Sequence, residues 1–206
     1  MATYVAARLY GLFAANAAVC VIARRGPTHF SQLILWNTET DVFTTGQWIH
    51  GNVTSGTLSS DGKYAALCIV GGKTKSGFYP DGCYMVICRP PFFTALEFWE
   101  GYSRGDVSFR EGDVIAWPGS EYPHEHRSRT KCPFQVTTSK IELPKIVTRR
   151  LTQGYGEQIL ADQQGRLVKF EAGAVYDVSR DEPRLLCNLN PNKFEEVISP
   201  DWARHW

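Results

Sequence analysis

The sequence has almost no net charge, no apolar run of membrane length and little helical periodicity. Each of these absences restricts the classes of protein to which the chain can belong. A net charge of +1 over 206 residues gives no electrostatic reason to expect nucleic acid or an anionic membrane as a partner. No apolar run is long and pure enough to span a bilayer. We identify no catalytic motif and no cofactor-binding motif, so we expect no cofactor. These absences favour a non-enzymatic protein whose partner is another protein or a second copy of the chain.

What the sequence does contain is a phrase that recurs four times, at intervals of about fifty residues. The clearest copy is Gly-Thr-Leu-Ser-Ser-Asp-Gly-Lys-Tyr-Ala-Ala-Leu at 56–67, and the others begin at Phe13, Val107 and Leu160. In each copy a short apolar segment leads through a tight polar turn into an apolar strand. A repeat of this length is typical of β-propeller blades.

Each repeat contains two further strand-like segments after the phrase, separated by turns rich in Gly, Pro, Asn and Asp. We therefore predict an all-β fold, a single β-propeller domain over residues 1–206 with four blades of about fifty residues. A four-blade part of a larger ring is the open alternative. The expected blades cover residues 9–48, 53–99, 104–149 and 156–198, followed by a tail at 199–206.

Two segments carry a family resemblance, Leu33–Thr40 and Leu58–Leu67. Together they resemble a blade of the WD40-type or TolB-type β-propellers, in which a Trp closes the third strand and a Ser-x-Asp-Gly-Lys turn opens the next blade. The Trp-Asp pair of WD40 blades stands here as Trp36-Asn37, and the Gly-His pair is absent. The resemblance implies an architecture and indicates no particular protein.

The N-terminal apolar segment, Leu9–Ala23, admits two interpretations. Ala15-Asn16-Ala17 is similar to a signal-peptidase site, but the segment also aligns without gaps on the second repeat. We favour a strand pair, with a cleaved signal as the alternative. Most of the six cysteines lie inside apolar runs and none forms a Cys-x-x-Cys pair, which favours buried, reduced thiols. We expect a cytoplasmic or otherwise intracellular protein, and a virion location stays open.

The connector in the middle of each repeat varies most, and variable connectors on a regular scaffold are where recognition is usually placed. Two of them stand out, 71–82 and 118–132, together with the Trp-rich tail and the Pro-Pro-Phe-Phe step at 90–93. The candidate partner-binding residues are Phe78, Tyr79, Phe92, Phe93, Tyr122, Arg127, Arg129, Trp202 and Trp206.

His124 and His126 are the only clustered histidines, and on an extended segment they project from one face, as two metal ligands would. No third ligand lies nearby in the sequence, so we favour a solvated connector over a metal site.

Three functions remain in order of preference. The first is a non-enzymatic interaction module that presents its connectors to a macromolecular partner. The second is a structural subunit of a larger assembly such as a viral or phage particle. The third is a small-ligand binder or metal-dependent enzyme that uses the central channel.

Overall fold

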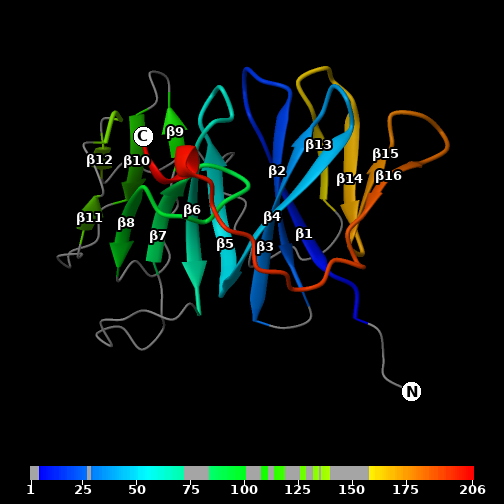
Figure 1. Ribbon diagram of the computed structural model, residues 1–206. Helices are drawn as coiled ribbons and strands as arrows, with labels where there is room; N and C mark the ends of the chain where they lie inside the picture. Colours follow the sequence, from blue (N-terminus) through cyan, green and yellow to red (C-terminus); the bar gives the residue numbers. More distant parts are fainter. Residues whose placement is uncertain are drawn as a thin grey trace.

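The computed structural model describes residues 5–26, 29–71, 84–100, 108–110, 114–118, 126–128, 132–134, 136–139 and 158–206. Over these residues the protein is all-β, as the sequence predicts (Figure 1). The single helical element of this part is a 3-10 turn at Asp201–Arg204. No helix in the described ranges has the length and hydropathy needed to cross a membrane.

Two sheets are plain four-stranded meanders in which consecutive strands are antiparallel neighbours. The first sheet consists of β1 (Arg8–Phe13), β2 (Val19–Arg25), β3 (Phe30–Asn37) and β4 (Val42–His50). The fourth sheet consists of β13 (Gln158–Ala161), β14 (Leu167–Glu171), β15 (Ala174–Asp177) and β16 (Arg184–Asn188). The first sheet includes the N-terminal segment, which forms the paired strands β1 and β2.

The second sheet is also a meander but gains a fifth strand from the next repeat. Its strands are β5 (Asn52–Leu58), β6 (Ala65–Val70), β7 (Tyr84–Cys88) and β8 (Glu97–Glu100), with β11 (His126–Ser128) on the outer edge. Residues 118–132 are predicted from the sequence to be a connector, and at 126–128 that prediction is wrong, because these residues form the strand β11. These residues satisfy the free edge of β8, which lets a short polar segment pair as a strand.

The third sheet departs most from the predicted blade. It contains β9 (Ser108–Arg110), β10 (Val114–Pro118) and β12 (Val136–Ser139). β9 and β10 are antiparallel as expected, but β12 runs parallel to β10. Parallel neighbours need a connection of about a dozen residues or more, and the long segment 119–135 supplies it. The end of the expected third blade, from residue 140 to 149, lies outside the described residues.

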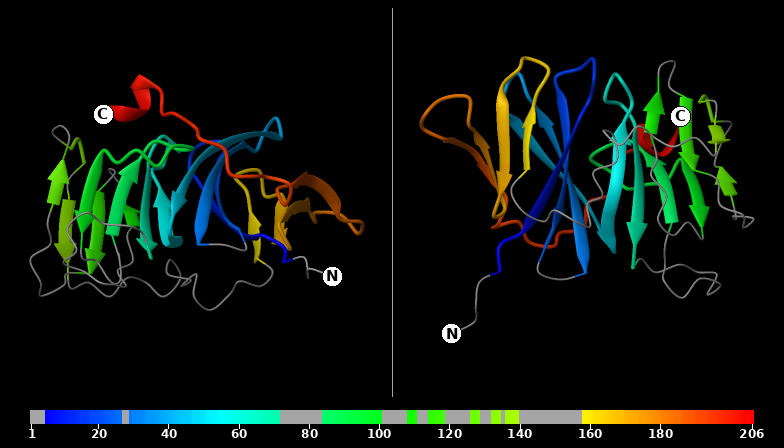
Figure 2. Two further views of the ribbon diagram at one scale, coloured as in Figure 1. Left: turned by 60° about the horizontal axis from the view of Figure 1, so that its bottom comes forward. Right: turned by 180° about the vertical axis from the view of Figure 1, so that it is seen from behind.

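Three hydrophobic clusters lie between successive sheets and fix their order as third, second, first and fourth (Figures 1 and 2). In β2 the alternation of side chains divides the strand between two of them. Val21 packs toward the second sheet, whereas Cys20 and Ile22 pack toward the fourth. Strands such as β2, β6 and β7 are buried on both faces, which explains why they are continuous apolar runs in the sequence.

In the first, second and fourth sheets the repeated phrase forms the turn between the first two strands. In the second sheet Asp61 Oδ1 accepts hydrogen bonds from the backbone N–H of Lys63 (3.0 Å) and from the Ser59 hydroxyl (2.7 Å). Gly62 has φ of +72°, a conformation that glycine adopts without steric cost. Asp162 accepts from Gln164 and Arg166 N–H in the same way in the fourth sheet. The phrase therefore encodes a turn that satisfies its own backbone donors.

Candidate functional site

Several residues that the sequence singled out lie outside the described part of the chain. They are Phe78, Tyr79, Tyr122, His124 and Arg129. His126 and Arg127 belong to β11, where their backbones are paired in register with Trp99 and Phe98 of β8. Their roles as metal ligand and partner contact stay predictions.

The described candidates divide into buried and accessible groups. Phe93 is 8% exposed and belongs to the core between the first and second sheets, while its N–H donates to Gln47 Oε1 at 2.8 Å. Phe92 beside it is partly exposed and meets the Trp202 ring edge-on, with centroids 5.5 Å apart. Trp202 itself is 58% exposed. Of the two adjacent phenylalanines, only Phe92 is therefore placed to contact a partner.

Trp202 belongs to a segment that we call the strap, residues 189–206, which crosses from the fourth sheet over the first to the second (Figure 1). The first residues of the strap are held by Arg24, a side chain of β2 that is 3% exposed. Its Nε donates to Leu189 O at 2.7 Å, and its Nη2 lies 3.3 Å from the carbonyl oxygens of Asn190 and Asn192. The side chain thus satisfies three carbonyl groups of a segment without regular structure, which fixes its path.

Two further contacts hold the middle of the strap on the first and second sheets. Gln47 Nε2 donates to Val197 O at 2.7 Å, and the hydroxyl groups of Thr94 and Ser199 are hydrogen-bonded to each other. The scaffold therefore binds the strap through main-chain carbonyl groups and through the side chains of Asn192 and Ser199.

Three large apolar side chains project from the strap, and we call them the ridge: Phe194, Ile198 and Trp202. They are 64%, 74% and 58% exposed, among the highest values for large hydrophobic residues in the described part. Phe194 stands on Phe30 and on Trp48, with ring centroids 5.5 and 6.0 Å away. Phe194 and Trp202 are thus held by aromatic neighbours and remain exposed to solvent together with Ile198.

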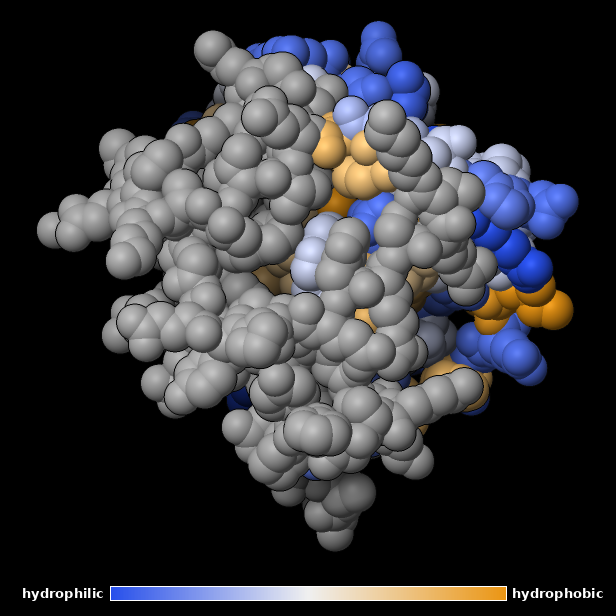
Figure 3. All heavy atoms as spheres, turned by 90° about the vertical axis from the view of Figure 1, so that its left-hand side faces the viewer, coloured by the Kyte–Doolittle hydropathy of each residue, from blue (hydrophilic) through white to orange (hydrophobic). Residues whose placement is uncertain are grey.

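In the view from the side of the third sheet, the described residues that can be seen are largely hydrophilic along the top and right, with hydrophobic atoms in the centre and at the right (Figure 3).

The sequence predicts Trp202 as a partner contact but not Phe194 or Ile198. The missed signal was the four-residue spacing of apolar residues 194, 198 and 202 among polar neighbours. That spacing is typical of a helix, but Pro191 precedes the three residues and Pro200 lies between the last two, and both disfavour a helix.

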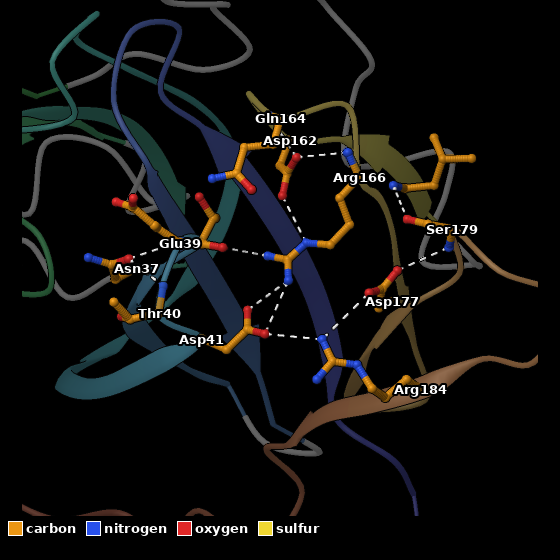
Figure 4. A network of polar contacts seen from close by, with 12 residues as sticks. Asn37, Glu39, Thr40, Asp41, Asp162, Gln164, Arg166, Asp177, Ser179 and Arg184 are labelled. Atoms are coloured by element: carbon orange, nitrogen blue, oxygen red, sulfur yellow. Dashed lines mark hydrogen bonds and ion pairs between the residues drawn. The ribbon is translucent and has the colours of Figure 1, made fainter.

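The described residues contain no group of three or more His, Cys, Asp or Glu side chains placed to hold a metal ion. A network of polar contacts lies at a junction between sheets (Figure 4). It joins Asp162 and Arg166 of the fourth sheet to Thr38 and Asp41 of the first.

One catalytic pattern was overlooked in the sequence. Gly101-Tyr102-Ser103-Arg104-Gly105 matches the Gly-x-Ser-x-Gly pattern of hydrolase nucleophiles. That motif requires a strand before it and a helix after it, whereas here β8 precedes and the strand β9 follows. Ser103 lies outside the described residues, and its context does not support a nucleophile elbow.

A comparison of the chain with known protein families, curated proteins and solved structures finds no match. The case for a function therefore depends on the geometry of the chain itself.

Proposed function

We propose that this protein is a four-bladed β-propeller that acts as a non-enzymatic interaction module, and that the ridge is its partner-binding surface. The propeller part is supported by the spatial order of the sheets. A simple row of repeats would place the fourth sheet beside the third, whereas here it packs against the first. An arrangement in which the last unit returns to the first is characteristic of a ring.

The strands that begin each repeat also support this interpretation. β1 contacts β5, and β5 contacts β9. In a propeller the first strand of each blade lies nearest the central axis, where neighbouring blades approach one another most closely.

The interaction part is carried by one observation, the exposure of Phe194, Ile198 and Trp202 along a segment that the scaffold fixes in place. Ordering a flexible segment costs conformational entropy on binding, and a strap already held by Arg24 and Gln47 avoids much of that cost. Aromatic residues on rigid supports are enriched at interface hot spots.

The test compares proteins retained by the immobilised chain from cells that express it. A ridge variant, Phe194→Ser with Ile198→Ser and Trp202→Ser, should lose at least one retained partner. The matched control is Val42→Ser with Leu185→Ser, since these side chains are 57% and 54% exposed on β4 and β16. The partner should survive in the control. If the ridge variant and the wild type retain the same proteins, the proposal is wrong.

A second function, a structural subunit of a larger assembly, is favoured by the same ridge if its partner is another copy. Light scattering separates the two. An assembly subunit should have a mass above that of one chain, reduced to one chain by the ridge variant. A monomeric wild type contradicts the assembly role.

A further inference from the structure

The last residue of the strap, Trp206, packs into a cluster of aromatic side chains between the second and third sheets. Its ring centroid lies 5.4 Å from that of Tyr64 and 5.5 Å from that of Phe134. Phe109 meets Phe134 from the other side, with centroids 5.3 Å apart. We call Tyr64, Phe109 and Phe134 the aromatic cluster, and its floor is formed by the buried residues Ala66, Cys68, Met85, Ile87 and Trp99.

The scaffold also recognises the main chain next to this indole. Arg89 Nε donates to His205 O at 2.9 Å, and its guanidinium lies over the Tyr64 ring, 4.5 Å from the centroid. Earlier in the strap, Ala203 is fully buried and the Trp202 ring contacts the ring of Phe92. Buried aromatic anchors combined with hydrogen bonds to the peptide main chain are recurring elements of peptide recognition.

Residues 201–206 are joined to the rest of the fold by a long segment that contains no strand, 189–200. Their contacts to the aromatic cluster come from residues more than a hundred positions earlier, apart from Phe134. Trp206 Nε1 is buried and has no hydrogen-bond partner in the described part of the protein. An unmet buried donor costs free energy, so the contact is weaker than its apolar area alone would make it. This cost applies to any indole bound in the same way, so a partner segment displaces residues 201–206 where it also supplies an acceptor for the indole N–H or makes further contacts.

We propose that the aromatic cluster and Arg89 form a peptide-binding site for a tryptophan-bearing segment of a partner, and that residues 201–206 occupy it in cis. The partner would insert its indole between Tyr64 and Phe134 and offer the preceding carbonyl to Arg89. This inference rests on the proposed interaction function. It adds that the ligand of the aromatic cluster is a tryptophan-bearing segment. The strap end then acts as a competitor that sets the concentration of partner needed for binding.

The experiment titrates a synthetic peptide with the sequence of residues 199–206 into the full chain and into Trp206→Ala, followed by calorimetry. The variant should bind the peptide at least tenfold more tightly than the wild type, because the internal competitor has lost its anchor. A peptide with its final Trp replaced by Ala should bind the variant at least tenfold more weakly. Adding Arg89→Ala to the variant should weaken binding several-fold. Leu185→Ala, which removes an exposed side chain of β16, should behave as the wild type does.

Equal binding by the wild type and a folded Trp206→Ala chain, or none by either, would overturn this inference. If Trp206→Ala does not fold, hydrogen exchange on the wild type decides the matter. Excess peptide should raise exchange of the amides of residues 203–206, and unchanged exchange contradicts the proposal. A failure here leaves the ridge untouched, since that surface is judged by its own partner-retention variants.

Discussion

Arg166 and Asp41 join the fourth sheet to the first, with Arg166 Nη1 lying 2.9 and 3.1 Å from the two Asp41 carboxylate oxygens (Figure 4). The same guanidinium donates through Nε to Asp162 at 2.9 Å and through Nη2 to Thr38 O at 2.7 Å. Burial lowers the pKa of Arg166, but its bonds to Asp162 and Asp41 outweigh that effect and raise the pKa. The Arg166 guanidinium therefore donates to three acceptor groups at the junction between the first and fourth sheets.

Arg166→Gln should reduce the free energy of unfolding by about 2–3 kcal/mol, because it leaves the fully buried Asp162 carboxylate without its cation. Denaturant titration measures this. Arg184→Ala is the control, since Arg184 is 64% exposed and lies 3.3 Å from the same Asp41. Exposed ion pairs contribute little, so we expect a loss under about 0.5 kcal/mol. Equal losses in the two variants would mean that the junction has no special role.

A substitution at Gly11 would test the packing between the first and fourth sheets. A Cβ atom at this position of β1 would overlap the ring of Phe170, which is 1% exposed. Because a close-packed core does not yield, Gly11→Ala should destabilise the protein by about 1–3 kcal/mol. Phe170→Leu should recover part of this loss in the double variant, although it is destabilising alone. Additive effects in this double-mutant cycle would contradict the contact between β1 and β14.

The turn at Asp61 provides a prediction about pH. Partial burial raises the pKa of Asp61, but hydrogen bonds from Lys63 and Ser59 together outweigh it and the pKa is lowered. A lowered carboxyl pKa stabilises the fold above the ordinary value of about 4, and the stabilisation is lost as the pH falls through the lowered pKa.

Asp61→Ala should therefore cost about 1 kcal/mol at pH 7, by analogy with the loss of a capping residue, and the gap to the wild type should close in acid. Unfolding titrations between pH 7 and strong acid measure the difference. Lys63→Ala should change little, since its ammonium group is exposed and its ion pair is screened by solvent. A gap that persists unchanged in acid would show that the carboxylate charge is irrelevant to this turn.

Local patterns explain why the strands and turns could be predicted from the sequence. The turn at Ser59–Gly62 is stabilised by hydrogen bonds among its own residues, and a continuous apolar run in the sequence predicts β2. The same local logic could not separate Phe92 from Phe93, because the difference arises from how the segment enters the core beside Gln47. Adjacent residues of an extended chain face opposite ways, and only tertiary packing decides which way is inward.

The pairing of β11 and the path of the strap could not be predicted for a related reason. β11 is three polar residues that pair because β8 offers an edge, and no local pattern encodes that partner. The strap is fixed by Arg24, a side chain more than 160 residues away in the sequence. Long-range hydrogen bonds to main-chain carbonyls leave no periodic signature.

Cys88 supplies a prediction at the alkaline end. Burial raises the pKa of this thiol, at the end of β7, to about 12. In the unfolded chain the thiol ionises near its ordinary pKa of about 8.5–9, so the folded state loses stability as the pH rises from there toward 12. The loss amounts to at most about 1.4 kcal/mol per pH unit for one group.

Cys88→Ala should flatten the dependence of the unfolding free energy on pH above 9 by up to this amount. Cys187→Ala should flatten it less, because Cys187 is only partly buried. Denaturant titrations at stepped pH under reducing conditions measure the slopes, and identical slopes in Cys88→Ala and the wild type would show that Cys88 is accessible to water in the folded protein.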